Sequence, residues 1–223
     1  MNADWFLPAP AALVPRVASA YRIDRRIEPK DRVALTFDDG PHAEGTSAVL
    51  EELARAGATA TFFLVGEQVE LRPALAREIV AAGHEVGVHG HRHTLVLRRR
   101  VRALAEDLDR AVSVIADATG VVPILYRPPY GVFSSGALAH VRGRGWRPLL
   151  WSTWGRDWER RATPQSIARR ATRGLRAGDV VLLHDSDAYS SDGSWRRTAA
   201  ALPAVLDAVA ALGVDAASVT HST

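Results

Sequence analysis

The sequence predicts an α/β fold, because short apolar runs alternate along the chain with longer amphipathic runs. The short runs are typical of buried strands, and they cover residues 32–37, 58–65, 84–89, 124–127, 147–152, 179–184 and 214–219. The longer runs are typical of helices, and they cover residues 46–56, 72–82, 98–118, 135–144, 164–176 and 196–212. Parallel strands need crossover connections. The alternation therefore predicts about seven parallel strands, either in a closed or nearly closed β/α barrel or in an open doubly wound sheet.

The ends of the predicted helices agree with these boundaries. Several helices stop at a glycine, which readily adopts the left-handed conformation that ends many helices, namely Gly57, Gly83, Gly120, Gly145, Gly178 and Gly213. No linker rich in proline, glycine or serine divides the chain after its first thirty residues. We therefore expect an N-terminal extension over residues 1–31 and one folded domain over residues 32–223.

The composition is that of a globular protein and excludes several kinds of site. Of 223 residues, 47% are hydrophobic and 24% are charged, which argues against disorder. The formal net charge is only +3, and the basic run at 98–102 leads into acidic residues of a predicted helix. This pattern favours a solvated helix face over nucleic-acid binding. The chain has no cysteine, so a metal site must use histidines and carboxylates.

The N-terminal residues lack the pattern of a typical signal peptide. Asp4 stands where basic residues are usual, and three prolines interrupt the apolar stretch, although residues 18–20 resemble a cleavage site. No segment has the roughly 20 apolar residues that span a bilayer. As written, the chain is expected to stay in the cytoplasm, with action at the cell surface or outside the cell left open.

Ionisable side chains follow four of the predicted strands. Asp38 and Asp39 follow the first strand, His89 ends the third, Arg127 ends the fourth and His184 ends the sixth. In β/α folds ligands bind at the carboxyl ends of the strands, because the loops that leave these ends surround one face. Each group alone has an ordinary explanation, such as a helix N-cap, a hydrogen-bonded structural histidine or a surface salt bridge. Their convergence on one face favours an active site.

Three alternate histidines, at positions 89, 91 and 93, are candidate metal ligands. If the chain turns helically after the strand, His89 and His93 lie on one face, about 5–6 Å apart at Cβ, and His91 points away. If the chain stays extended, all three point the same way, but at about 3.3 Å per residue His89 and His93 are too far apart to share one ion easily. Gly90 makes a turn easy. We therefore prefer His89 and His93 as ligands, with one carboxylate of the adjacent aspartates as the third.

The remaining groups supply acid and base chemistry. The aspartate of the Asp38–Asp39 pair that does not bind the metal is well placed as a general base beside the attacking water. His184 arrives from a distant strand end and can protonate a leaving group. Together these residues predict metal-assisted hydrolysis of an acyl bond.

The same residues belong to five ordered motifs that resemble those of the polysaccharide deacetylases, also called the NodB homology domain or carbohydrate esterase family four. The motifs are TFDDGP at 36–41, HGHRH at 89–93, RPPYG at 127–131, Asp157-Trp158, and LLHD at 182–185. The resemblance covers roughly residues 32–219, and residues 32–223 are therefore the expected deacetylase catalytic domain. It implies a distorted (β/α) barrel of about seven parallel strands and hydrolysis of an N- or O-acetyl group, usually on an N-acetylated sugar.

The resemblance also implies a role for each metal-binding and acid–base residue. Asp39, His89 and His93 are expected to bind one divalent ion, most often zinc. Asp38 is the expected general base, and Arg127 keeps it ionised and oriented because a neighbouring cation favours the charged form.

On the other side of the site, the resemblance makes His184 the expected general acid for the departing amine. Asp157 holds it in the needed tautomer and raises its pKa. The backbone N–H of Tyr130 is expected to help stabilise the oxyanion, and Trp158 and Leu182 are expected to line the pocket for the acetyl methyl.

Several features depart from the family pattern or have no role in it. Gly90 stands where the family usually has Ser or Thr, so a side-chain hydrogen bond that would steady the metal loop is missing. His91 adds a third imidazole, which we expect to face solvent in preference to competing as a ligand. The fourth motif is a short match. The polar loop at 186–195 is expected to rim the site, with no role assigned to its residues.

The expected function is a metal-dependent deacetylase of a carbohydrate such as peptidoglycan or a chitin-type oligosaccharide. One alternative is the same reaction on a small N-acylated molecule. A wall polymer lies outside the cell, and the N-terminus is a poor match to a signal peptide, which favours a substrate inside the cell. Another alternative is a carbohydrate-binding protein without turnover. The presence of both a base and an acid argues against it. Protein partners, oligomeric state and the particular substrate are not readable from the motifs.

Overall fold

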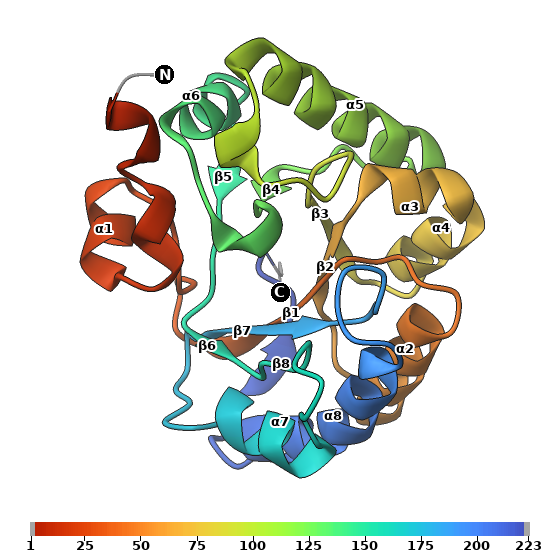
Figure 1. Cartoon of the computed structure of the whole chain (residues 1–223). Coiled ribbons are helices and arrows are strands. Elements are labelled where there is room, and N and C mark those ends of the chain that lie inside the picture. The colour runs from red at the N-terminus through yellow and green to blue at the C-terminus, as the bar shows by residue number, and fades with distance from the viewer. Residues whose placement is uncertain (1–2, 221–223) are drawn as a thin grey trace.

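The computed structural model of the chain describes residues 3–220 and shows one curled, wholly parallel sheet surrounded by helices (Figure 1). Its strands are β1 (Arg32–Asp38), β2 (Thr61–Leu64), β3 (Glu85–Val88), β4 (Leu125–Tyr126), β5 (Arg147–Pro148), β6 (Thr153–Trp154), β7 (Val180–His184) and β8 (Asp215–Ala217). They follow the order β5-β4-β3-β2-β1-β7-β6, and β8 pairs with the first half of β1. The expectation of a distorted barrel of about seven parallel strands is confirmed.

The helices lie outside the curled sheet and bury their apolar faces against it (Figure 1). They are α1 (Pro15–Ala20), α2 (Gly45–Ala56), α3 (Gly66–Leu71), α4 (Pro73–Ala81), α5 (Val101–Thr119), α6 (Ser135–Gly143), α7 (Pro164–Ala171) and α8 (Ser194–Ala210). Short 3₁₀ turns lie at Ala3–Phe6, Ala9–Ala12, Val96–Arg98 and Pro129–Gly131. No helix within residues 3–220 is long and apolar enough to cross a membrane.

Several elements differ from the sequence-based expectation. The strand expected at 147–152 ends early, at Pro148, as β5, and β6 begins beyond the expected range, at Thr153. Between them the backbone N–H of Leu150 donates to the carbonyl of Asp24, at 2.8 Å. Helix α7 ends at Ala171, short of residue 176. Helix α3 was not expected, since six residues that begin with glycine are too few to show a helical period.

The N-terminal residues pack into the same core as the sheet. Asp24 forms a bridge with Leu149, just after β5, and Arg26 forms a bridge with Asp179, just before β7. Because β5 is one end of the strand order and β7 is next to the other end, residues 24–26 link the two sides of the curled sheet. Ile27, on the same segment, is 1% exposed within the hydrophobic core.

Candidate active site

The carboxyl ends of the strands surround a cavity of about 240 Å³. It is lined by Asp38, Asp39, His89, His93, Tyr130, Gly131, Trp151, Trp154, Trp158, Leu182, His184, Tyr189 and Ser190. Each predicted site residue lines this cavity except Arg127 and Asp157, which are fully buried behind it. The topology therefore brings together side chains from strand ends that are far apart in the sequence.

One side of the cavity carries three potential metal ligands, Asp39, His89 and His93. The Nε2 atoms of His89 and His93 lie 3.4 Å and 3.2 Å from Asp39 Oδ1. This oxygen is buried and has no hydrogen-bond donor among the described residues. Burial by itself raises the pKa of Asp39, but the two imidazoles outweigh that effect and hold it well below its ordinary value. A buried carboxylate that faces two imidazole nitrogens fits a divalent cation.

The backbone and the second ring nitrogen orient two of these side chains. Asp39 adopts a φ of 80°, a left-handed conformation that aspartate tolerates better than most residues. The Nδ1 of His89 lies 2.8 Å from the carbonyl oxygen of Arg127, which can only accept, so Nδ1 carries a proton and Nε2 is the ring nitrogen that faces Asp39.

The loop between His89 and His93 is bent, and the expected helical turn does not form. Gly90 adopts a φ of 94°, and the two imidazole centroids come to 5.3 Å from each other. The N–H groups of Gly66 and Glu67 donate to the carbonyls of residues 90 and 91, each at 2.9 Å. Backbone hydrogen bonds from the start of α3 therefore hold the loop. They act where Gly90 has no side-chain hydroxyl to form a hydrogen bond.

His91 does not face solvent as expected. It is 4% exposed and packs under the start of α3, where a Cβ on Gly66 would lie 2.4 Å from its Nδ1. Its Nε2 lies 3.8 Å from a carboxylate oxygen of Glu70, and its N–H donates to Asp107 at 2.9 Å. The expectation was wrong because α3, which covers the ring, was not evident in the sequence.

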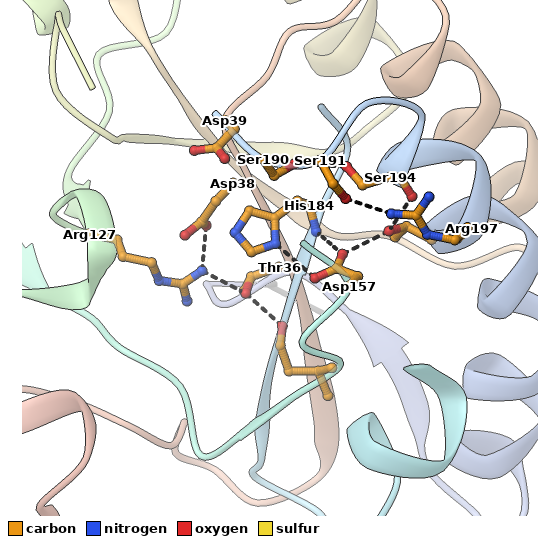
Figure 2. A network of polar contacts seen from close by, with 12 residues as sticks. Thr36, Asp38, Asp39, Arg127, Asp157, His184, Ser190, Ser191, Ser194 and Arg197 are labelled. Carbon is orange, nitrogen blue, oxygen red and sulfur yellow. Dashed lines mark hydrogen bonds and ion pairs between the residues drawn. The ribbon is translucent and has the colours of Figure 1, made fainter. Parts of the chain in front are cut away.

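Asp38 and Arg127 form a buried ion pair on the floor of the cavity (Figure 2). Asp38 Oδ1 accepts from Arg127 Nη1 at 2.7 Å, and the same nitrogen donates to Thr36 Oγ1 at 2.8 Å. Arg127 Nη2 donates to the carbonyl of Leu150 at 2.9 Å, and its guanidinium lies 4.1 Å from the ring centroid of Phe63. Burial lowers the pKa of Arg127, while the carboxylate of Asp38 acts to raise it.

His184 and Asp157 form a second pair on the opposite side (Figure 2). Asp157 Oδ1 lies 2.9 Å from His184 Nδ1, and Oδ2 accepts the His184 N–H at 2.7 Å and the Thr198 hydroxyl at 2.8 Å. Burial acts to lower the pKa of His184, but Asp157 outweighs it and raises the pKa to about 10. Thr198 lies 41 residues from Asp157, and no motif pointed to it.

Tryptophans form one wall of the cavity. Trp158 packs edge-on against His184, with ring centroids 5.3 Å apart, and Trp154 packs against Trp158 at 5.5 Å. Trp151 continues the series at 5.6 Å from Trp154. Only Trp158 was expected here, although the string WSTWGRDW already carries all three tryptophans. The exposed side chain of Tyr130 also lines the cavity and packs edge-on against His93, with ring centroids 4.7 Å apart.

The loop at 186–195 brings in two residues that sequence reasoning did not assign. Tyr189 stacks on His93, with centroids 4.1 Å apart and an interplanar angle of 9°. Its hydroxyl donates to Glu67 Oε1 at 2.6 Å. Burial, followed by this carboxylate, raises the pKa of Tyr189, so the phenol keeps its proton. Ser190 also lines the cavity.

Asp185, the last residue of the fifth motif, is fully buried beside the turn that carries the two aspartates. Its carboxylate lies directly against Gly40, where a Cβ would approach Oδ2 to 2.3 Å. It accepts a hydrogen bond from Thr46, and burial raises its pKa to about 7. Only a glycine fits at position 40, which accounts for the Asp-Asp-Gly string.

The fold and the site define a parallel α/β half-barrel with a candidate metal triad flanked by one acid–guanidinium pair and one histidine–carboxylate pair. The profile of the family described as polysaccharide deacetylase matches residues 25–148, more than half of the chain. The chain therefore belongs to the polysaccharide deacetylase family, carbohydrate esterase family four, as the motif resemblance indicated. The match contains the first three motifs. The fourth and fifth lie beyond it, where Asp157 meets His184.

Curated relatives and solved structures agree with this assignment. The chitooligosaccharide deacetylase of Sinorhizobium fredii is 35% identical over 185 residues, 79% of this chain and 85% of the relative. The peptidoglycan-N-acetylglucosamine deacetylase PgdA of Listeria monocytogenes is 32% identical over 154 residues, 69% of this chain. This match spans about a third (32%) of the Listeria protein. The crystal structure of the Bc1960 peptidoglycan N-acetylglucosamine deacetylase superposes with a TM-score of 0.83 at 25% identity, covering 90% of this chain and 92% of that one.

Proposed function

We propose that this protein is a metal-dependent deacetylase that hydrolyses N-acetyl or O-acetyl groups on a carbohydrate such as peptidoglycan or a chitin-type oligosaccharide and releases acetate. One observation carries the proposal. The triad of Asp39, His89 and His93 faces a cavity that also holds two separately buried pairs, Asp38 with Arg127 and His184 with Asp157. A protein that only binds sugars needs neither a base nor an acid beside such a triad.

The triad residues would hold one divalent cation, and zinc suits a set of two imidazoles and one carboxylate. When bound, the cation supplies Lewis acidity to the attacking water and to the acyl oxygen. The other groups carry the proton transfers.

Asp38 is the proposed general base. Its pairing with the buried guanidinium of Arg127 fixes one of its oxygens, at 2.7 Å from Nη1. It takes a proton from the water that attacks the acetyl carbonyl carbon. The backbone N–H of Tyr130 is the proposed donor to the resulting oxyanion, a contribution of about 3 kcal/mol.

His184 is the proposed general acid. An ionised carboxylate can only accept, so Asp157 keeps the proton of His184 on Nδ1 and leaves Nε2 as the atom that faces the cavity. As the C–N bond breaks, Nε2–H gives its proton to the departing amine, or to the alkoxide when the substrate is an ester. Trp158 and Leu182 are the proposed walls for the acetyl methyl.

The comparisons support a carbohydrate as the substrate. The relatives described above are named as deacetylases of peptidoglycan N-acetylglucosamine and of chitooligosaccharides. A wall of tryptophans provides the flat apolar surface on which a sugar ring packs, while the cavity of about 240 Å³ admits an acetamido group.

The test is acetate release from three kinds of substrate: chitooligosaccharides, peptidoglycan, and small acetamides. Each is assayed with the protein as purified, after treatment with a chelator, and after zinc is added back. We expect release from at least one carbohydrate, loss with the chelator and recovery with zinc. Release of acetate from small acetamides alone would mean that the protein is an amidohydrolase of small N-acylated molecules. No release from any substrate with added metal would overturn the catalytic proposal.

A further inference from the structure

The two histidines of the triad are oriented in different ways. His89 Nδ1 bonds the carbonyl of Arg127 at 2.8 Å, the arrangement that usually orients a metal-binding histidine. His93 Nδ1 is buried and has no hydrogen-bond partner among residues 3–220. The orientation of the His93 ring must therefore come from packing.

Aromatic side chains supply this packing. Tyr189 stacks on the His93 imidazole almost in parallel, with centroids 4.1 Å apart and an angle of 9°. The Tyr130 ring meets the same imidazole edge-on at 4.7 Å. Tyr130 is 60% exposed, so Tyr189 is the more firmly held of the two contacts. The Tyr189 ring covers one face of the imidazole and therefore restricts rotation of the imidazole about the χ2 bond of His93.

Tyr189 is held by side chains of α3. Its hydroxyl donates to Glu67 Oε1 at 2.6 Å and accepts from Gln68 Nε2 at 3.1 Å. Gln68 Oε1 in turn accepts from Arg72 Nη1 at 2.7 Å. Both hydrogen-bonding functions of the phenol are therefore used, and its ring cannot swing into the cavity without breaking them.

The same segment also holds the backbone of both ligand-bearing loops. Val65 N–H donates to the carbonyl of Gly40, beside Asp39, at 3.0 Å. Gly66 N–H donates to the carbonyl of Gly90, beside His89, at 2.9 Å. Residues 65–72 are thus one platform on which the two loops and Tyr189 are fixed relative to one another.

We propose that Tyr189 is a positioning residue that fixes the His93 imidazole for metal binding, in place of the hydrogen bond that orients His89. The inference rests on the proposed metal site. It gives the loop at 186–195 a function, because this loop carries Tyr189 across the site to His93. It also identifies a contact that limits the motion of His93, whose loop contains Gly90 and so has no side-chain hydroxyl at that position.

The test is the affinity of the full-length protein for Zn²⁺, measured by competition with a chromogenic chelator. Tyr189→Ala is expected to weaken zinc binding by about 10- to 100-fold, the range for loss of a group that orients a metal ligand. Tyr189→Phe keeps the stacked ring and loses only the hydroxyl contacts, so its loss is expected to be smaller. Ser191→Ala is the matched control from the same loop, because it removes the bond from Arg197 and leaves Tyr189 in place.

Two further measurements separate positioning from folding. The metal-free Tyr189→Ala protein is expected to unfold cooperatively, at a lower temperature than the metal-free wild type because the contacts of Tyr189 with Glu67 and Gln68 are lost. If it does not fold, Tyr189→Leu serves instead, since leucine fills much of the space without a flat ring. Wild-type zinc affinity in a folded variant without the ring would overturn the role of Tyr189 and leave the metal site intact. Failure of the wild type itself to bind zinc would overturn the metal site and, with it, this inference.

Discussion

The carboxylate of Asp157 contacts His184 twice, through the imidazole Nδ1 at 2.9 Å and through the backbone N–H at 2.7 Å. Two contacts from one carboxylate fix the plane of the imidazole as well as its position. Because Asp157 is fully buried, its charge acts on His184 with little screening by water. The pair accounts for the raised pKa of the proposed general acid.

The first prediction concerns the pH dependence of turnover. A general acid must be protonated, so activity is expected to fall as the pH rises through the pKa of His184, which is about 10. Asp157→Asn removes the charge that raises this pKa. The alkaline limb of kcat/KM is therefore expected to move to lower pH by about 1 to 3 units. Profiles of both proteins with a soluble chitooligosaccharide provide the measurement. An alkaline limb at the same pH in both would exclude this role for the pair.

The second prediction separates the proposed base from the proposed ligands. Asp38→Asn keeps the shape of the side chain and removes the base, so turnover is expected to fall by about 10²- to 10⁴-fold while zinc content stays at the wild-type level. His93→Ala removes an imidazole from the triad and is expected to lose the metal. Metal analysis of the two purified variants beside the wild type checks both statements. Equal metal content in the two variants would contradict the ligand assignment.

The third prediction concerns Gly90, whose φ of 94° strains any other residue. A Cβ there would also lie 3.1 Å from the carbonyl oxygen of Arg92. Gly90→Ser is expected to lower stability by roughly 1–2 kcal/mol and the melting temperature by about 2–8 °C, and to weaken zinc binding.

Gly83→Ala is the matched control for Gly90→Ser. Gly83 has a similar φ of 85°, and an added Cβ meets nothing within 4 Å. This variant is expected to lose stability through backbone strain alone and to keep wild-type zinc affinity. A Gly90→Ser protein that was more stable and bound zinc more tightly would show that the loop lacks a needed hydroxyl.

The fourth prediction uses the buried carboxyl of Asp185, whose pKa is raised from 3.8 to about 7. A raised pKa means that the folded state favours the protonated form. The contribution of the Asp185 carboxyl to the free energy of unfolding is therefore fully present below about pH 4. It is lost as the pH rises through about 7. In the metal-free protein, the stability of Asp185→Asn relative to the wild type is expected to rise between pH 5 and pH 8 by roughly 2–3 kcal/mol.

Urea unfolding at the two pH values measures the effect of Asp185→Asn. The exposed carboxylate of Asp117, on α5, provides a control, because Asp117→Asn is expected to show the same difference from wild type at both pH values. A constant stability difference for Asp185→Asn across this range would mean that the Asp185 carboxyl does not change its charge.

Much of the fold was predictable, because its signals are local. Strand β1 follows a short apolar run, helix α5 follows a periodic apolar pattern, and the left-handed Gly57 and Gly120 end their helices as expected. Helix α3 was missed because six residues show no clear period. The break between β5 and β6 was not expected, and there the Leu150 N–H donates to the carbonyl of Asp24, more than a hundred residues away.

The gathering of the active-site side chains around one cavity was foreseeable for a related reason. Asp38, His89, Arg127 and His184 stand at the ends of apolar runs, and parallel strands bring such ends to one edge of a sheet. The pattern of residues along the chain therefore specified which side chains meet.

How these side chains are held could be read only from the folded chain. His91 is buried by α3, Thr198 supports Asp157, and Tyr189 covers His93 through a bond to Glu67, 122 residues away. Such contacts join segments that are far apart in the sequence, so no local sequence pattern predicts them. The chemistry of the site follows from residue types at strand ends, and its rigidity follows from packing between distant segments.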